Sequence, residues 1–346
     1  MVNGATILLT GACGYIGSHT WVALAQAGFA VVGVDNFANS SPGVLPRLQR
    51  LTGQTPVFEQ ADVCSAADLE AVFSRHRIDA VVHFAALKAV GESTTRPLAY
   101  YANNLGGLLT TCRVMQAHGC RRLVFSSSAT VYGAPERLPI CEDAPLSATN
   151  PYGQTKLMGE TLLRDLAQAD PDWRTATLRY FNPVGAHESG LIGEEPRGTP
   201  NNLMPYVAQV AAGQRPFLQV FGDDYPTPDG TGVRDYLHVM DLAEGHVAAL
   251  RWLLAGGDAL TLNLGTGQGH SVLEVVSAYA QASGREIPLR MAPRRPGDVA
   301  ACWADASQAF KALAWQAGRD LAQMCDDSWR WSRGSGKLEA ATRRAA

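Results

Sequence analysis

Three glycines near the start of the chain place the strongest constraint on its fold. Residues 6–9 are apolar and read as a strand, and Thr10-Gly11-Ala12-Cys13-Gly14-Tyr15-Ile16-Gly17 follows directly. Residues 16–26 then have the apolar spacing of a helix that ends at Gly28. Glycines at this spacing permit a tight turn, a close approach of the backbone to a pyrophosphate, and close packing of helix on strand. The helix would offer its first N–H groups to the phosphates. The segment predicts a dinucleotide-binding strand–turn–helix unit, and a glycine turn that serves packing alone is the alternative.

The order of elements in the first half of the chain predicts a parallel sheet. Further strands are expected at 30–34, 57–59, 80–84, 123–126 and 175–178, and helices at 66–75, 97–118 and 152–169. Strands and helices that alternate in this way form a Rossmann-type α/β fold, a doubly wound parallel sheet with helices on both faces. The strands are apolar along most of their length, as expected for strands that are buried on both faces.

Asp35 indicates which dinucleotide binds. It follows the second predicted strand, 18 residues after Gly17. A carboxylate there accepts hydrogen bonds from the hydroxyls of the adenosine ribose and repels a 2′-phosphate, which favours NAD over NADP. The alternative is an ordinary turn residue before Asn36. Asp62 and Val63 follow the third predicted strand and are candidates for contacts with adenine. The alternative for Asp62 is the N-cap of the next helix.

A change in composition after residue 181 suggests how the chain is divided. Residues 182–235 are rich in Pro, Gly and Asn and are expected to form substrate-binding loops. We expect a NAD-binding Rossmann domain at 1–181, with the segment 237–266 packing back on it. We expect a smaller α/β C-terminal domain for substrate at 182–332, and a flexible tail at 333–346. In the second domain, Ser271 and Glu274 have the spacing of a capping box at the start of a helix over 271–283.

Composition and charge exclude several classes of protein. The 29 basic and 32 acidic residues give a net charge of −3, which provides no attraction to nucleic acid or to anionic membranes. No apolar run approaches the ~18 residues of a membrane span, and the N-terminus lacks the basic region of a signal peptide. The seven cysteines show neither Cys-x-x-Cys nor zinc-site spacing, which predicts free thiols and no metal. The chain is therefore expected to be soluble and cytoplasmic.

A tyrosine and a lysine four residues apart are the strongest catalytic candidates. Tyr152 and Lys156 open the predicted helix at 152–169, so both side chains lie on one face, a turn apart. To act as a base near neutrality, a tyrosine must lower its pKa by about 3, or about 4 kcal/mol. We expect the Lys156 ammonium and a positively charged nicotinamide to supply this stabilisation. An exposed helix pair without function is the alternative.

Serines at the end of the fifth predicted strand complete the candidate site. Residues 126–133 read Ser-Ser-Ser-Ala-Thr-Val-Tyr-Gly, and the carboxyl end of a parallel strand faces the crevice where ligands bind. Ser128 would donate a hydrogen bond to a substrate hydroxyl or relay its proton. The alternative is a serine that satisfies the backbone of the turn.

These motifs together resemble the extended short-chain dehydrogenase/reductase superfamily and, within it, the UDP-glucose (UDP-galactose) 4-epimerase family. The resemblance runs in register from about residue 5 to 332. Besides the glycine loop and the Tyr152/Lys156 pair, it is carried by the segments 84–93, 126–133, 151–153, 178–187, 200–206 and 229–236.

The resemblance implies ligand contacts residue by residue. In addition to the three loop glycines, it places NAD at Tyr15, Ile16, Asp35, Asn36, Asn39, Ser40, Asp62, Val63, Phe84, Ala85, Lys88, Asn103, Lys156 and Phe181. It places the catalytic hydroxyls at Ser128 and Tyr152. It places the UDP-sugar at Asn182, Asn202, Leu203, Phe221, Arg234, Tyr236, Arg295 and Asp298, and the sugar pocket at Cys302. Two arginines suit a diphosphate and an aromatic ring suits uracil, although each residue taken alone also has an ordinary structural reading.

The implied activity is a NAD-dependent isomerisation. An epimerase of this family interconverts UDP-glucose and UDP-galactose at carbon 4 through a transient 4-keto sugar. Cys302 stands where some relatives carry a pocket-narrowing tyrosine, so UDP-N-acetylhexosamines are expected substrates as well; a cysteine that fills core space is the alternative. Relatives commonly dimerise through helices that correspond to 97–118 and 152–169, so a homodimer is expected.

The sequence disfavours two other classes of function. A nucleotide-sugar 4,6-dehydratase needs an Asp-Glu pair after the strand-end hydroxyl residue, where this chain has Ala129 and Thr130. A cofactor sensor without catalysis can dispense with the Tyr152/Lys156 pair, which this chain retains. No feature of the sequence indicates a purely structural protein.

Overall fold

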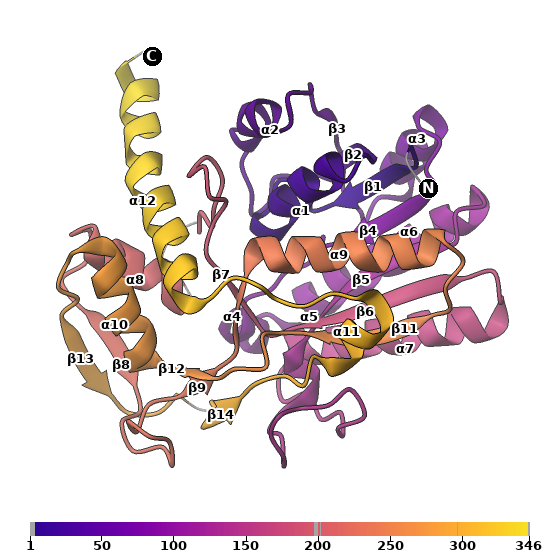
Figure 1. The fold of residues 1–346 in the computed structure, drawn as a ribbon. Coiled ribbons are helices and arrows are strands. Elements are labelled where there is room, and N and C mark those ends of the chain that lie inside the picture. The colour runs from indigo at the N-terminus through magenta and orange to yellow at the C-terminus, as the bar shows by residue number, and fades with distance from the viewer. Residues whose placement is uncertain (1–3, 197–199, 201, 296, 345–346) are drawn as a thin grey trace.

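A seven-stranded, fully parallel sheet forms the centre of the molecule (Figure 1). The computed structural model describes residues 4–196, 200, 202–295 and 297–344. In spatial order the strands are β11 (Leu260–Leu264), β6 (Arg174–Tyr180), β5 (Arg122–Ser128), β4 (Ala80–His83), β1 (Thr6–Thr10), β2 (Ala30–Asp35) and β3 (Val57–Gln60). The strands β1, β2 and β3 follow one another toward one edge of the sheet. After β3 the chain crosses back over them, and β4 pairs with the other side of β1. The predicted doubly wound sheet is confirmed.

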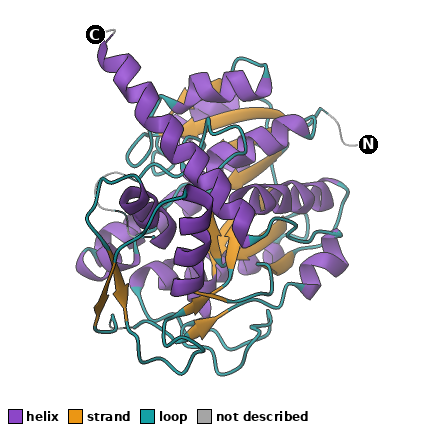
Figure 2. Cartoon of the chain, turned by 60° about the vertical axis from the view of Figure 1, so that its left-hand side comes forward, coloured by secondary structure: helices purple, strands orange, loops and turns teal. Residues whose placement is uncertain are grey.

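Helices cover both faces of the sheet (Figure 2). One face packs on α1 (Tyr15–Gln26), α2 (Val44–Thr52), α9 (Val239–Leu254) and α11 (Ser307–Leu313). The other packs on α3 (Ala66–Arg75), α6 (Gly106–Ala117) and α7 (Pro151–Ala169). Side chains of β1 alternate between these two layers: Ile7 and Leu9 lie in the first and Leu8 in the second, all fully buried. Burial on both faces explains why the strands are apolar along their length.

A smaller unit follows β6 and is built around its own core. It contains α8 (Leu203–Ala211), α10 (Val272–Ser283) and the parallel pair β8 (Leu218–Phe221) and β13 (Leu289–Ala292). Short pairs link it to the large sheet: β7 (Asn182–Val184) with β10 (Tyr236–His238), and β9 (Val233–Arg234) with β12 (His270–Ser271) and β14 (Ala301–Cys302). The predicted capping box of α10 is confirmed, because Ser271 Oγ accepts from Glu274 N and Glu274 Oε2 from Ser271 N.

The structure differs from the sequence expectations at two helices. The expected helix at 97–118 is interrupted, because a wider π-helical turn, η1 (Tyr101–Leu105), separates α5 (Pro97–Tyr100) from α6. A further short helix, α4 (Val90–Thr95), precedes the expected range. At the other end, α12 (Leu321–Arg344) continues through most of the expected flexible tail, whose last two residues lie outside the described part. The three arginines and four alanines of the tail favour helix, although the segment lacks an apolar stripe.

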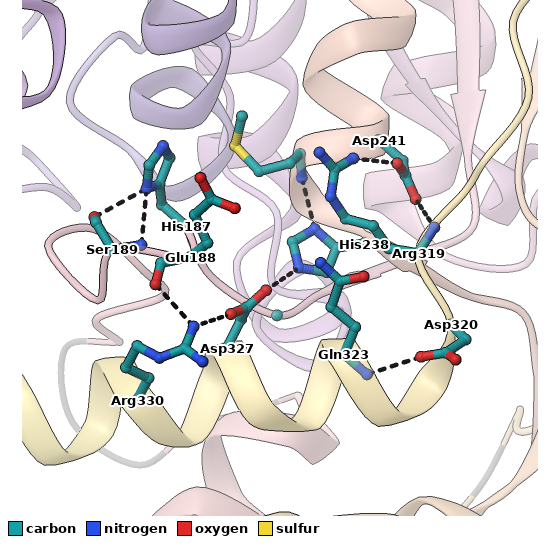
Figure 3. Close-up of polar contacts among 12 residues, drawn as sticks. His187, Glu188, Ser189, His238, Asp241, Arg319, Asp320, Gln323, Asp327 and Arg330 are labelled. Carbon is teal, nitrogen blue, oxygen red and sulfur yellow. Dashed lines mark hydrogen bonds and ion pairs between the residues drawn. The ribbon is translucent and has the colours of Figure 1, made fainter.

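Helix α12 is tied to the start of α9 by buried polar contacts (Figure 3). The Nδ1 atom of His238 accepts from Met240 N at 3.0 Å, so the ring proton lies on Nε2 and is donated to Asp327 Oδ2 at 3.3 Å. Arg330 also contacts this carboxylate. Burial alone would raise the pKa of Asp327, but the His238 hydrogen bond and Arg330 hold it below its usual value. The C-terminal helix is thereby fixed beside β10, which leads into α9.

Candidate active site

The candidate site residues gather at one edge of the large sheet. Because its strands are parallel, their carboxyl ends meet there: Thr10 ends β1, Asp35 ends β2, His83 ends β4 and Ser128 ends β5. This edge, beside the point where the strand order reverses, is where ligands bind in open α/β sheets. The sheet topology thus brings together the glycine loop and the strand-end serines, which lie more than a hundred residues apart in the sequence.

The glycine loop is a tight turn that only glycines can make at two positions. Gly11 has a φ of +66°, and Gly14 N donates to Gly11 O at 3.1 Å. A Cβ atom added to Gly17 would lie 2.2 Å from Gly11 O. Helix α1 begins at Tyr15, and no described side chain caps its first turn or places a carboxylate in it. Its first N–H groups therefore suit the pyrophosphate of NAD.

The Asp35 carboxylate is held in place by the loop that surrounds it. It accepts from Cys13 N at 3.0 Å, from Phe37 N at 2.8 Å and from Ser40 Oγ at 2.7 Å. Oδ1 takes two of these bonds and Oδ2 takes one. A carboxylate has about four acceptor sites, so Oδ2 retains capacity for a ribose hydroxyl. The residues present therefore fit NAD.

The remaining predicted cofactor residues lie in the loops and helical segments that follow the strands of the sheet. Asn36 Nδ2 donates to Asp62 Oδ2 at 3.2 Å, which joins the loops after β2 and β3. Lys88 is exposed and pairs with Glu194 at 3.1 Å. Of the others, Val63 and Phe181 are buried, Asn39 is exposed, and Tyr15, Ile16, Ser40, Phe84, Ala85 and Asn103 are of intermediate exposure.

The three predicted catalytic residues lie together at the end of β5 and the start of α7. Asn150 caps α7 by accepting from Gly153 N at 2.9 Å, which fixes where the helix begins. Lys156 is 3% exposed; its Nζ donates to Ser126 O at 2.6 Å and lies 5.8 Å from the centroid of the Tyr152 ring. Ser128 is hydrogen-bonded to the Tyr152 hydroxyl. The geometry forms a Ser–Tyr–Lys cluster.

Burial dominates the protonation of this cluster. Burial raises the pKa of Tyr152 to about 12, although the hydrogen bond with Ser128 acts to lower it. Burial also lowers the pKa of Lys156 to about 7. This differs from the sequence expectation that Lys156 lowers the pKa of Tyr152. The reason is that both groups lose hydration, and that the ammonium lies against the face of the ring and a carbonyl oxygen. The protein's own groups leave Tyr152 protonated at neutral pH.

Several predicted substrate residues come together on the short strands beside this cluster. Asn182 of β7 is the register partner of Tyr236 in β10, and Arg234 of β9 is the register partner of Cys302 in β14. Cys302 is half-buried, and burial raises the pKa of its thiol to about 11. Tyr236, by contrast, is 3% exposed, and its ring belongs to the core of the smaller unit.

Other predicted substrate residues form two further groups. The Arg295 guanidinium stacks 4.1 Å above the Phe221 ring and lies 3.7 Å from Asp298 Oδ2. Asn202 and Leu203 stand at the start of α8. The stacked arginine and ring offer a flat cationic surface that suits a nucleotide base or a diphosphate.

Sequence reasoning missed two residues that organise the site. Glu194 Oε1 accepts from both Lys88 Nζ and Asn202 Nδ2, so it joins a predicted cofactor residue to a predicted substrate residue. Asn104 contacts both backbone groups of Leu87 and donates to Thr155 Oγ1 at 3.0 Å, which fixes the loop after β4 against α7. Asn104 follows another asparagine in the sequence and is the one buried residue of η1, so residue spacing gave no signal for it, and none existed for Glu194.

Comparison with known proteins agrees with this geometry. The model of the NAD dependent epimerase/dehydratase family matches residues 7–265. The UDP-glucose 4-epimerase of Bacillus subtilis is 58% identical over 325 residues, which cover 94% of this chain and 96% of the relative.

Two crystal structures share the fold across nearly the whole chain. The UDP-glucose 4-epimerase of Stenotrophomonas maltophila, with bound NAD and formylated UDP-arabinopyranose, has a TM-score of 0.94 at 54% identity and covers 96% of this chain and 99% of that one. The enzyme of Bifidobacterium longum, in complex with NAD⁺ and UDP, has a TM-score of 0.92 at 51% identity, with the same coverage. The glycine loop, Asp35 and the Ser–Tyr–Lys cluster thus stand in a chain that belongs to the NAD-dependent epimerase/dehydratase family.

Proposed function

We propose that the protein interconverts UDP-glucose and UDP-galactose by inverting carbon 4 of the sugar with tightly bound NAD. The observation that carries this proposal is the meeting of Ser128, Tyr152 and Lys156 at the sheet edge that also holds the glycine loop. An oxidation that is reversed within the same site needs one acid–base group and a cofactor that stays bound, and this arrangement offers both.

Each residue has a defined part in the proposed reaction. Bound NAD supplies the chemistry of hydride acceptance from carbon 4 and hydride return, and its positive ring favours the Tyr152 phenolate. Tyr152 takes the proton of the 4-hydroxyl while the 4-keto sugar forms, and returns it after the sugar has turned its other face. Ser128 hydrogen-bonds the same hydroxyl, and Lys156 supplies positive charge beside the phenolate. Arg234 and Arg295 hold the diphosphate while the sugar turns.

The structure around Ser128 favours this reaction over a 4,6-dehydration. A dehydratase needs an additional acid and base to expel the 6-hydroxyl. Here Ala129 follows Ser128, and the Thr130 hydroxyl donates to Ser128 Oγ at 3.0 Å. Neither residue offers a carboxyl group.

Product analysis tests the proposal. Purified protein given UDP-galactose, with no NAD added, is expected to form UDP-glucose until the two reach equilibrium. NAD is expected to be released on denaturation in about one copy per chain. Absence of UDP-glucose from a protein that carries NAD would overturn the proposal and favour a cofactor sensor.

We further propose that UDP-N-acetylhexosamines are substrates, because Cys302 is small and half-buried beside Arg234. Replacing Cys302 by tyrosine should reduce kcat/KM for UDP-GlcNAc by at least about tenfold and change that for UDP-glucose by much less, since the loss of space affects the larger 2-substituent. Parallel assays of both substrates with the wild type and Cys302→Tyr provide the measurement. If the wild type does not turn over UDP-GlcNAc, broad specificity is refuted.

We propose that the protein acts as a homodimer through α5, α6 and α7. Leu98 is 83% exposed, Leu109 39% and Met158 41%, and these neighbouring helices lie on one side of the molecule. Exposed apolar side chains on adjacent helices are typical of an interface. Sedimentation is expected to give twice the mass of the chain, and Leu109→Arg with Met158→Glu should give a monomer. A wild-type monomer at assay concentration would refute the dimer.

We propose the cytoplasm as the compartment, because all seven cysteines are free, including the exposed Cys64 and Cys141. In the described part of the chain, none of the helices combines the length and the apolar character that a membrane span requires.

A further inference from the structure

Helix α7 contacts the last three residues of β5, Ser126 to Ser128. Tyr152, Lys156 and Glu160 are spaced four apart and lie on one face of the helix. The Tyr152 hydroxyl bonds with Ser128, Lys156 Nζ donates to Ser126 O, and Ser127 Oγ donates to Glu160 Oε1. The first two contacts belong to the catalytic cluster. The third lies beneath it and involves none of the proposed ligand contacts.

Arg179 completes this third contact from the neighbouring strand. It is the register partner of Ser127, so both side chains leave the sheet on the same side, toward Glu160. Its Nε donates to Glu160 Oε1 at 3.0 Å and its Nη2 donates to Glu160 Oε2 at 2.8 Å. Its Nη1 donates to the Tyr132 hydroxyl at 2.8 Å and to Glu142 O at 2.9 Å. Exposed fractions of 5% and 8% show that the Arg179 and Glu160 side chains are buried.

A buried ion pair of this kind contributes little net stability to a fold. Removing two charges from water costs several kcal/mol each, and apolar residues of similar size often stabilise a core as well or better. The pair is instead held by several hydrogen bonds, and it connects β5, β6 and α7 at the level of the catalytic residues. Its position suggests a part in the reaction.

Glu160 also acts on the charge of Lys156. Burial lowers the pKa of Lys156 to about 7, and the negative charge of Glu160, one turn further along α7, acts in the opposite direction. Three other titratable groups that act on Lys156 or Tyr152 are uncharged at neutral pH. Burial lowers the pKa of His83 on β4 to about 3. It raises the pKa values of Tyr180 on β6 and Tyr100 on α5 above the usual value of a tyrosine.

We propose that the buried Glu160–Arg179 pair is a positioning element of the active site, which sets the distance between Ser128 and Tyr152 and keeps the Lys156 ammonium charged. In this arrangement Arg179 holds the Glu160 carboxylate in place, and Ser127 transmits its position to the strand that carries Ser128. The inference rests on the proposed roles of Tyr152 and Lys156.

The test removes both charges together, because Glu160→Gln alone would leave the Arg179 charge buried without a counter-charge. In the double variant Glu160→Gln/Arg179→Met, Lys156 loses its proton at lower pH, and the Tyr152 phenolate loses support. The pH at which Tyr152 ionises therefore rises. The acid limb of the kcat/KM profile for UDP-galactose should move upward by about one pH unit, which lowers the rate about tenfold on that limb.

An ion pair elsewhere in the chain, between a buried carboxylate and a half-buried arginine, provides the control. Asp241 on α9 is 2% exposed and pairs with Arg319 ahead of α12 (Figure 3). Asp241→Asn/Arg319→Met should lower the melting temperature but leave the acid limb at its wild-type position. A general loss of stability is thereby separated from a change in the protonation of the site.

Ser127→Ala is a milder second arm that removes only the hydroxyl. Its kcat is expected to fall at least about threefold with KM and NAD content unchanged, because Ser128 and Tyr152 are less well held. The inference is overturned if the folded double variant keeps the wild-type acid limb or, where that variant does not fold, if Ser127→Ala keeps the wild-type kcat. If the proposed roles of Tyr152 and Lys156 are themselves wrong, the Tyr152→Phe variant will be active, and this result distinguishes that case.

Discussion

Replacing Tyr152 by phenylalanine should lower kcat for UDP-galactose by at least about 10²-fold, while the chain stays folded and retains NAD. The substitution removes one hydroxyl. It leaves the ring, and hence the contact with the Lys156 ammonium 5.8 Å from the ring centroid. Phenylalanine cannot take a proton from the 4-hydroxyl, and Ser128 alone is too weak a base to replace it. Measurement of kcat, NAD content and melting temperature on the same preparation tests the prediction.

A second tyrosine–serine pair supplies the control for this variant. The Tyr279 hydroxyl lies 3.3 Å from Ser328 Oγ in the core of the smaller unit, among residues of α10 and α12. Tyr279→Phe therefore removes a buried hydroxyl that is bonded to a serine, as Tyr152→Phe does, but away from the site. We expect it to cost about 1 kcal/mol of stability and to leave kcat within about twofold. A Tyr152→Phe enzyme with near wild-type kcat would contradict the assignment of the base.

The resting protonation of the cluster makes this prediction specific to the bound cofactor. Burial raises the pKa of Tyr152 to about 12, so the protein's own groups do not ionise it at neutral pH. A positively charged nicotinamide beside the ring is then needed as well as Lys156. The tyrosine would consequently act as a base chiefly when the cofactor is oxidised, which is the state in which a proton must be removed.

Local motifs explain which parts of the molecule could be predicted from the sequence. The glycine turn, the Asn150-capped start of α7 and the Ser271/Glu274 capping box depend on neighbours within a few residues, and their spacing is visible in the chain. The central strands β1, β2 and β4 were recognisable because burial on both faces leaves them largely apolar.

Features that depend on distant parts of the chain were not predicted. Glu160 and Arg179 meet only because the register of β5 and β6 places Arg179 beside Ser127. The π-helical turn η1 lies in what reads as one uninterrupted helix, and it precedes α6 with Asn104 turned toward the loop after β4. The protonation of Tyr152 depends on burial, which residue spacing does not determine.

The turn between β1 and α1 gives the other large expected effect. Replacing Gly17 by alanine would place a Cβ atom 2.2 Å from Gly11 O and 3.0 Å from the Ala12 Cα atom. Both neighbours are backbone, so no side chain can move aside, and the loop itself must shift. Such overpacking costs about 1–3 kcal/mol or more, and here it displaces the N–H groups that face the pyrophosphate. We expect NAD content and epimerase activity to fall together by at least about tenfold.

Gly106 provides the matched comparison for that loss. It too lies in the first turn of a helix, α6, and a Cβ atom added there would meet no atom within 4 Å. Gly106→Ala should therefore retain NAD and activity and should be as stable as the wild type or slightly more so, since alanine restricts the unfolded chain. Nucleotide released on denaturation, measured for both variants, separates the steric effect at Gly17 from the general effect of a methyl group in a helix. A Gly17→Ala protein with a full complement of NAD would show that the turn tolerates a side chain, and the cofactor would then have to be held by contacts other than the glycine loop.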